Sequence, residues 1–372
     1  MKITVVHPSE LGPAEVARWC ELQEGLPALG SPFLSPGFTL AVAALQPRAR
    51  VAVLTEGGRI VGFFPFERRG PRYGVPVAAG LTDSQGLVHA AGLQWDAQEL
   101  LAACGLDVWE FDRLVDGQQP FAAYERLREP SPVIDLRDGA PAVLSRLRAD
   151  SSRFSDKLPR QQRRLARELG PLRFEFGSRD PETLHTLMAW KSAQYQRTGR
   201  SDRFARPWIV RLLEDLQRTD RHGLSLVLST LYAGDTPVAA HVGLRTGPVL
   251  AGWFPAYDAR FGVYSPGMLH RLHLIEAAAA AGVTSIELGR GTKESKELFK
   301  SGDQVVAEGA VVRRPLGSAM YLVRRAPERR LRQAVLDDPR LYRAADRLLK
   351  GYGRARSKVS RQPTQPPTAS SR

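Results

Sequence analysis

Residues 253–269 read Trp-Phe-Pro-Ala-Tyr-Asp-Ala-Arg-Phe-Gly-Val-Tyr-Ser-Pro-Gly-Met-Leu, and this stretch decides the fold. It predicts the end of a strand, a loop with Gly262 and Gly267, and a helix that begins at Met268. The amino terminus of a helix presents unpaired N–H groups and partial positive charge, which suit a pyrophosphate. An ordinary strand-to-helix turn explains the same residues, because short glycine motifs often match by chance.

The segments around this stretch predict an α/β fold, with a mixed (α+β) sheet and helices on both faces. Residues 226–241 have the strand-turn-strand pattern of a hairpin. Pro159 should kink or restart the helix in which it lies. The further strands are expected at 172–176, 249–255, 285–288 and 305–313, and the helices at 142–169, 180–191, 268–281 and 294–299.

The hairpin pattern occurs twice, which predicts two tandem domains. Residues 51–64 repeat the pattern of 226–241 about one domain length earlier. A chain of 372 residues is too long for one ordinary core. We expect a first domain at 1–145, a second at 146–314, and a tail at 315–372 that is helical and then disordered.

The net charge of +14 is concentrated in the tail. From Arg313 to Arg372 there are 16 basic and 4 acidic residues, so the rest of the chain is close to neutral. No apolar run approaches the roughly 18 residues that cross a bilayer, and Cys20 and Cys104 fit no metal-ligand spacing. The sequence therefore predicts no metal site and a cytoplasmic protein, with peripheral contact at the inner membrane surface as one role for the tail.

In this order, several motifs resemble the GNAT superfamily of N-acetyltransferases. More narrowly, they resemble its tandem-domain CelD-like or BioF-like branch, which is associated with cellulose and exopolysaccharide biosynthesis. The resemblance covers residues 150–312 well and the first half loosely. It is carried by residues 190–195, 204–208, 234–241, 254–258, 264–267 and 288–291 with Lys296, and in the first half by 31–33, 51–64 and 83–86.

The resemblance implies two tandem GNAT-type domains and a donor site at the start of the 268–281 helix. Tyr264, Ser265, Pro266, Gly267 and Met268 would then cradle the pantetheine-pyrophosphate part of acetyl-CoA or another acyl-CoA. Tyr-Ser-Pro-Gly stands where the family usually has Gln/Arg-x-x-Gly-x-Gly/Ala, which leaves the donor open. The related Fem-like transferases take aminoacyl groups from tRNA instead.

Four residues are candidates for proton transfer to and from the reacting groups. The imidazole of His241 could act directly or through water, or simply fill a strand position. Tyr257 and Asp258 follow a strand end, where they could face substrate or serve in packing and in a turn. Glu287 could order a water that activates the base, or face solvent.

Further residues are candidates for contacts with the two substrates. Lys296 could pair with a phosphate or a carboxylate, or lie on a solvated helix face. Asp202 lies on a loop that could close over the acceptor, or it caps a helix. Trp190 and Tyr195 fit a cleft wall or the core. Arg290 lies in the glycine-rich turn that belongs to the resemblance.

Three functions fit these features. The first is an N-acyltransferase, most simply an N-acetyltransferase, acting on a small-molecule amine such as an amino sugar of a surface polymer. The second is a Fem-like aminoacyl-tRNA-dependent transferase, and the third is a non-catalytic binding protein of a polysaccharide or membrane assembly. The basic segment 153–173 and the tail 313–372 could contact tRNA or an anionic membrane surface, or be solvated. The sequence leaves the acyl chain, the acceptor and the oligomeric state open.

Overall fold

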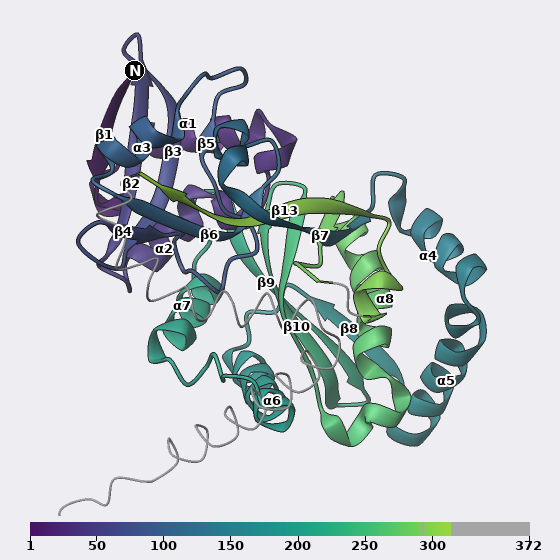
Figure 1. The fold of residues 1–372 in the computed structure, drawn as a ribbon. Coiled ribbons are helices and arrows are strands. Elements are labelled where there is room, and N and C mark those ends of the chain that lie inside the picture. The colour runs from purple at the N-terminus through teal and green to yellow at the C-terminus, as the bar shows by residue number, and fades with distance from the viewer. Residues whose placement is uncertain (292–293, 314–372) are drawn as a thin grey trace, which may run out of the picture.

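The computed structural model describes residues 1–291 and 294–313, so the predictions for the tail at 315–372 lie outside the described residues. The described strands form one mixed sheet in the order β1-β2-β3-β4-β6-β13-β7-β12-β11-β10-β9-β8, with β5 paired to β3 (Figure 1). The strands are β1 (Lys2–Val6), β2 (Ala49–Glu56), β3 (Arg59–Arg68), β4 (Tyr73–Val75), β5 (Val88–His89), β6 (Val108–Val115), β7 (Glu125–Asp135), β8 (Leu172–Phe176), β9 (Leu224–Ala233), β10 (Thr236–Thr246), β11 (Val249–Tyr257), β12 (Ser285–Glu287) and β13 (Gly302–Val312).

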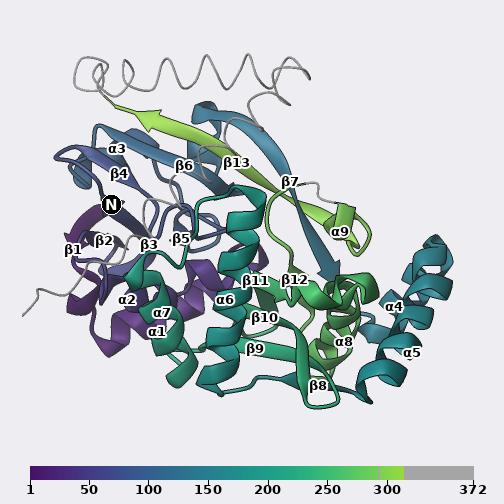
Figure 2. The same cartoon turned by 90° about the horizontal axis from the view of Figure 1, so that it is seen from below.

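Helices cover both faces of the sheet, which confirms the predicted fold class. The α-helices are α1 (Pro13–Glu24), α2 (Pro36–Ala43), α3 (Ala97–Ala103), α4 (Gly139–Asp150), α5 (Leu158–Leu169), α6 (Pro181–Thr198), α7 (Pro207–Arg218), α8 (Pro266–Ala280) and α9 (Glu294–Glu297). In the second half of the chain, α8, α4 and α5 lie beyond one face of strands β8–β11, and α6 and α7 lie beyond the other (Figures 1 and 2). Among these residues, no helix is long and apolar enough to cross a membrane.

Alternating residues of the strands supply a separate core on each face. Leu250 and Ile286 pack with Leu269 and Ile275 of α8. Ala251, next to Leu250, belongs to the core of α6 and α7. Because successive side chains of a strand point to opposite faces, Glu287, next to Ile286, points away from α8.

Strand β13 lies far from its neighbours in sequence. It pairs antiparallel with β6 on one side and with β7 on the other, and Figure 1 shows its yellow-green ribbon crossing into the blue and purple strands. Gly309 makes this approach possible, since a Cβ there would lie 2.2 Å from the Tyr124 carbonyl oxygen and 2.6 Å from Phe111 Cζ. The two halves of the chain therefore share one hydrogen-bonded sheet. The predicted division at residue 145 stays a proposal.

The helix expected at 142–169 is two helices. Helix α4 ends at Asp150, a π-helical turn covers Arg153–Lys157, and α5 starts at Leu158 with Pro159 in its first turn. Proline has no N–H to donate, so it is tolerated in a first turn and breaks a helix interior. The break between the two helices is at Ser151, whose backbone is extended, whereas the π-helical turn continues directly into α5. The irregularity before Pro159 is therefore a π-helical turn and not a new start of the helix.

Candidate functional site

A cavity of about 530 Å³ lies where two neighbouring strands separate. Strand β11 pairs in parallel with β12 over only three residues, Val249–Ala251, whereas it stays paired with β10 up to Tyr257. The backbone edge of β11 beyond Ala251 is therefore released toward the cavity. Because α6 and α8 cover opposite faces of the sheet and both contribute lining residues, the cavity connects the two faces.

The amino terminus of α8 forms the wall on one face. Ser265, Pro266, Gly267 and Met268 all line the cavity. Ser265 has a left-handed backbone (φ 54°) that turns the chain into the helix. A Cβ at Gly267 would lie 3.6 Å from Tyr257 Cδ1, in ordinary contact. Within this turn the Ser265 N–H donates to the Gly262 carbonyl oxygen (3.1 Å) and the Met268 N–H to the Ser265 carbonyl oxygen (2.9 Å), and Pro266 has no N–H. The Gly267 N–H and the partial positive charge of the helix terminus are therefore what the turn offers to an anion.

Tyr264 does not line the cavity, unlike the four residues that follow it. It is buried in the core beneath α8, and its hydroxyl donates a hydrogen bond to Glu168 of α5. That hydrogen bond raises the pKa of Tyr264 and lowers the pKa of Glu168. Tyr264 therefore anchors the loop on α5 and is not among the lining residues.

Two cationic side chains lie near this end of the cavity. Burial lowers the pKa of Arg271 to about 10, so it stays charged at neutral pH. One of its N–H groups donates to the Ser295 carbonyl oxygen (2.9 Å), and Arg271 has no carboxylate partner within the described part of the chain. Lys296 Nζ donates to the carbonyl oxygens of Gly289 (2.7 Å) and Arg290 (2.9 Å) and lines the cavity. Arg271 is therefore placed to attract a phosphate, whereas Lys296 also interacts electrostatically with Asp83.

His241 lines the same cavity from β10 and is only 6% exposed. Its Nδ1 has no hydrogen-bond partner within residues 1–291 and 294–313. Burial, and then the neighbouring His270, Arg271 and Lys191, hold the pKa of His241 well below 6.5. The imidazole is therefore neutral at neutral pH, and its ring centroid lies 6.0 Å from that of His270 on α8.

Glu287 lies on the opposite face of the sheet, one step behind the wall that Ile286 and Leu288 form. It is 6% exposed, and Ser31 Oγ donates a hydrogen bond to its Oε2 at 2.7 Å. Burial raises its pKa to about 7, the Ser31 hydrogen bond lowers it, and the nearby Asp83 raises it. Glu287 therefore holds a proton at weakly acidic pH and can lose it near neutrality.

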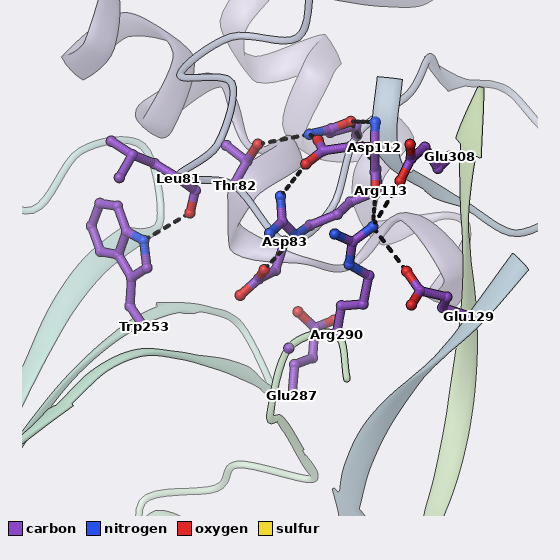
Figure 3. A network of polar contacts seen from close by, with 12 residues as sticks. Leu81, Thr82, Asp83, Asp112, Arg113, Glu129, Trp253, Glu287, Arg290 and Glu308 are labelled. Carbon is purple, nitrogen blue, oxygen red and sulfur yellow. Dashed lines mark hydrogen bonds and ion pairs between the residues drawn. The ribbon is translucent and has the colours of Figure 1, made fainter. Parts of the chain in front are cut away.

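Asp83, from the first half of the chain, is a lining residue that we did not predict. Its Oδ1 pairs with Arg113 Nε at 2.8 Å, and burial raises its pKa. Figure 3 shows Asp83 above Glu287 and next to Arg290. A Cβ at Gly289 would lie 2.5 Å from Asp83 Oδ2, so only glycine leaves room for this carboxylate. The first half thus contributes an acidic group to a cavity built mainly by the second.

The side chains of Tyr257 and Asp258, at the end of β11, have different surroundings. Tyr257 lines the cavity and is 37% exposed. Asp258 is buried and accepts a hydrogen bond from the Arg260 N–H (2.9 Å), and it pairs with the Arg260 guanidinium at 2.6 Å. The Arg260 hydrogen bond lowers the pKa of Asp258. Asp258 therefore shapes the loop that leads to α8.

The residues predicted to bind the acceptor are also divided. Tyr195 lines the cavity, while Trp190 is half-buried against the core beneath α6 and α7. Asp202 accepts hydrogen bonds from Ser192 Oγ (3.2 Å) and from the Phe204 N–H (3.0 Å), which orders the loop after α6. Arg290 pairs with Glu129 on β7 (2.9 Å) and Glu308 on β13 (3.4 Å) and so connects these strands (Figure 3).

Other lining residues escaped the sequence analysis, which singled out Trp190 and Tyr195 on α6. Lys191 and Gln194, also on α6, line the cavity with Tyr195, and their i, i+3, i+4 spacing was a usable signal. Lys191 Nζ donates to the Pro255 carbonyl oxygen on the released part of β11 (2.8 Å). The described part of the chain contains no group of His, Cys, Asp and Glu that could hold a metal ion.

Residues 152–301 match the family model of the acetyltransferase (GNAT) domain, and no curated protein matches the sequence. Similar solved structures include FemX (12% identity, TM-score 0.55), with 85% of this chain and 98% of that one covered. A conserved protein of unknown function from Bacteroides thetaiotaomicron has 8% identity and a TM-score of 0.51, with 83% and 99% covered. The third is the carboxy-terminal domain of a protein described as a lysylphosphatidylglycerol synthetase from Agrobacterium fabrum. It has 15% sequence identity and a TM-score of 0.50, with 84% of this chain and 96% of that domain covered. At these identities the solved structures show the fold alone.

Proposed function

Starting from the GNAT acetyltransferase domain at 152–301, we propose that this protein is an N-acyltransferase that moves an acyl group from acyl-CoA to an amine. One observation carries the proposal. The cavity joins a helix terminus on one face of the sheet to the Asp83 carboxyl on the other, with the buried Glu287 next to Asp83 behind the lining. A thioester donor and an amine acceptor could therefore meet where β11 and β12 separate.

The donor would lie along the released edge of β11. The backbone groups beyond Ala251 have no β12 partner. Pro255 has no N–H and its carbonyl oxygen accepts from Lys191, so the neighbouring residues of this edge would exchange hydrogen bonds with the amides of a pantetheine arm. Its pyrophosphate would then reach the first turn of α8 at Ser265–Met268, with Arg271 beside it. The Gly267 N–H and the Arg271 guanidinium together would give charge-assisted hydrogen bonds, which are stronger than bonds between neutral groups.

The reaction joins the amine nitrogen to the acyl carbon and breaks the carbon–sulfur bond. The ammonium form of the acceptor must first lose a proton, and Glu287, with its pKa of about 7, can receive it directly or through a water. A neutral His241 can donate an N–H to the thioester oxygen as negative charge develops there. Tyr257, next to Gly267, is placed to return a proton to the departing thiolate. The nitrogen loses a second proton as the amide forms, and this proton replaces the one that Tyr257 gives to the thiolate. The products are the amide, free CoA and the proton taken up by Glu287.

A second candidate donor, an aminoacyl-tRNA, is favoured by the position of α5. Helix α5 packs beside the loop before α8, where Gln161 Nε2 donates to the Val263 carbonyl oxygen (2.9 Å). Its exposed Arg160 and Arg163 have no carboxylate partner within the described residues. A polyanionic carrier bound at the cavity could continue across this basic surface. We rank this donor second, because the cavity itself accounts for a pantetheine arm and a pyrophosphate.

Calorimetric titration with acetyl-CoA tests the choice of donor. Saturable binding to the wild type is expected, and Gly267→Asp should remove it by placing a negative side chain at the helix terminus. Gly70→Asp is the matched control, since Gly70 lies outside the cavity and, like Gly267, has an ordinary backbone and a single neighbouring atom, 3.6 Å from its Cβ position. Equal binding by both variants would place the donor elsewhere, and no binding at millimolar acetyl-CoA would favour aminoacyl-tRNA or a non-catalytic role.

Three finer points remain proposals that rest on the sequence resemblance. These are the CelD-like or BioF-like branch, an acceptor that is an amino sugar of a surface polymer, and a cytoplasmic location with contact at the inner membrane surface. Acetylation of glucosamine by the purified protein, measured as CoA release, would support the second point. Turnover of other amines without glucosamine would contradict it.

A further inference from the structure

The acceptor would enter the cavity on the face of the sheet opposite α8. On this side the cavity is lined by charges of both signs. Asp83 enters it from the first half of the chain, and Arg200 enters it from the turn that follows α6. Tyr195 lines the cavity as well, and the Arg200 N–H donates to its carbonyl oxygen (2.9 Å), which fixes the turn. One cavity therefore presents a carboxylate and a guanidinium from different parts of the fold.

The positive charge of this turn is only partly compensated within the fold, where Tyr195 and Asp112 interact electrostatically with Arg203. Arg200 is exposed, and neither it nor Arg203 has a carboxylate partner in residues 1–291 and 294–313. Arg203 is half-buried, and a Cβ at Gly80 would lie 3.2 Å from one of its guanidinium nitrogens. Burial lowers the pKa of Arg203. A half-buried guanidinium without a carboxylate is costly unless a ligand supplies the negative charge.

The Asp83 carboxyl, unlike the two arginines of this turn, has an ion-pair partner. Its Oδ1 pairs with Arg113 and its Oδ2 faces Gly289, which has no side chain. Lys296 and Arg290 also lie close enough to interact with this carboxyl electrostatically. Glu287 lies close enough to Asp83 for their carboxyls to interact. A cation that enters the cavity would meet this pair of carboxyls from the open side.

We propose that the acceptor is an amine that also bears an anionic group, a carboxylate or a phosphate, with its ammonium at Asp83 and its anion at Arg200. The inference rests on the proposed function and narrows its substrate class. A neutral amine would satisfy Asp83 and leave the Arg200–Arg203 turn without a full counter-charge. Bound at both ends, the acceptor would have its nitrogen held near Glu287, where the proton must leave.

The test compares amines in pairs that differ by the anionic group, with CoA release from acetyl-CoA as the readout. Lysine is paired with cadaverine, which lacks the carboxylate, and glucosamine 6-phosphate is paired with glucosamine. We expect kcat/KM to be at least about tenfold higher for the anionic member of a pair, the size of one charge-assisted hydrogen bond. The two pairs also distinguish a carboxylate from a phosphate.

Two variants with matched controls assign the preference to residues. Arg200→Gln should lower kcat/KM about tenfold more for the anionic than for the neutral member. Arg197→Gln removes the same charge from an exposed position on α6 outside the cavity and should not change the preference. Asp83→Asn should raise KM for both members, whereas Asp112→Asn, which also removes a partner of Arg113, should not.

The outcomes separate this inference from the proposed function. Absence of acetyl-CoA binding would overturn the proposed function. If acetyl-CoA binds, three results would overturn the inference alone: equal use of both members, turnover of no anionic amine, or a preference that Arg200→Gln leaves intact. Thermal unfolding of each variant shows whether a loss of turnover comes from misfolding.

Discussion

Replacing Glu287 by glutamine should stabilise the protein at pH 8 and remove its activity. Burial raises the pKa of Glu287 from 4.5 to about 7, which at 1.36 kcal/mol per pH unit corresponds to about 3 kcal/mol. Between these two pKa values the folded state holds the proton more tightly than the unfolded state does. This contribution to stability is therefore fully present below pH 4.5 and is lost as the pH rises through 7.

Glutamine cannot ionise, and its side-chain oxygen can still accept the hydrogen bond from Ser31. Urea unfolding should therefore give similar free energies for wild type and Glu287→Gln at pH 5, and a variant more stable by about 3 kcal/mol at pH 8. Glu56→Gln, the same change at an exposed position, should follow the wild type at both pH values. Equal pH dependence of the wild type and Glu287→Gln would refute the assignment of this carboxyl as a buried proton carrier.

The same substitution, Glu287→Gln, should also lower the activity. If Glu287 accepts the proton of the amine, Glu287→Gln should lower kcat/KM by about a hundredfold or more. Acetyl-CoA binding should remain, because the donor wall is on the opposite face of the sheet. A variant that is both stabilised and fully active would leave Glu287 as a buried carboxyl without a role in proton transfer.

Three further perturbations follow from the contacts of single residues. Ser31→Ala removes a hydrogen bond that lowers the pKa of Glu287, so the acidic limb of the kcat/KM profile should move to higher pH. His241→Ala should lower kcat about a hundredfold with little change in acetyl-CoA affinity, as expected for the loss of one donor to the developing oxyanion; an unchanged kcat would exclude that role. Gly309→Ala should lower the free energy of unfolding by about 3 kcal/mol, because its Cβ would lie 2.2 Å from the Tyr124 carbonyl oxygen. Urea unfolding with the wild-type midpoint would contradict this last expectation.

Local sequence signals predicted much of the second half of the chain. The hairpin of β9 and β10, the start of α8 and the irregular helix around Pro159 all depend on residues close in sequence, such as a glycine turn or a proline that fixes the backbone. For the same reason, the positions of Ser265–Met268 along one wall followed from the strand-loop-helix order. Whether those residues bind a donor remains a proposal.

Long-range packing accounts for what the sequence did not disclose. Asp83 lines the cavity because a loop of the first half reaches Gly289, a contact between residues about 200 positions apart. The high pKa of Glu287 depends on its burial and on Ser31, which is 256 residues away. The hydrophobic period of β13 indicates a strand without indicating its partners, so its place between β6 and β7 could not be predicted.

The place of β13 also has a consequence for synthesis in the cell. A ribosome that adds about 5–20 residues per second would complete β7 on the order of 10 to 30 s before it completes β13. During that interval the facing edges of β6 and β7 have no strand between them. Unpaired edges are the surfaces on which chains aggregate, so the nascent chain should require chaperone protection until residue 312 has emerged.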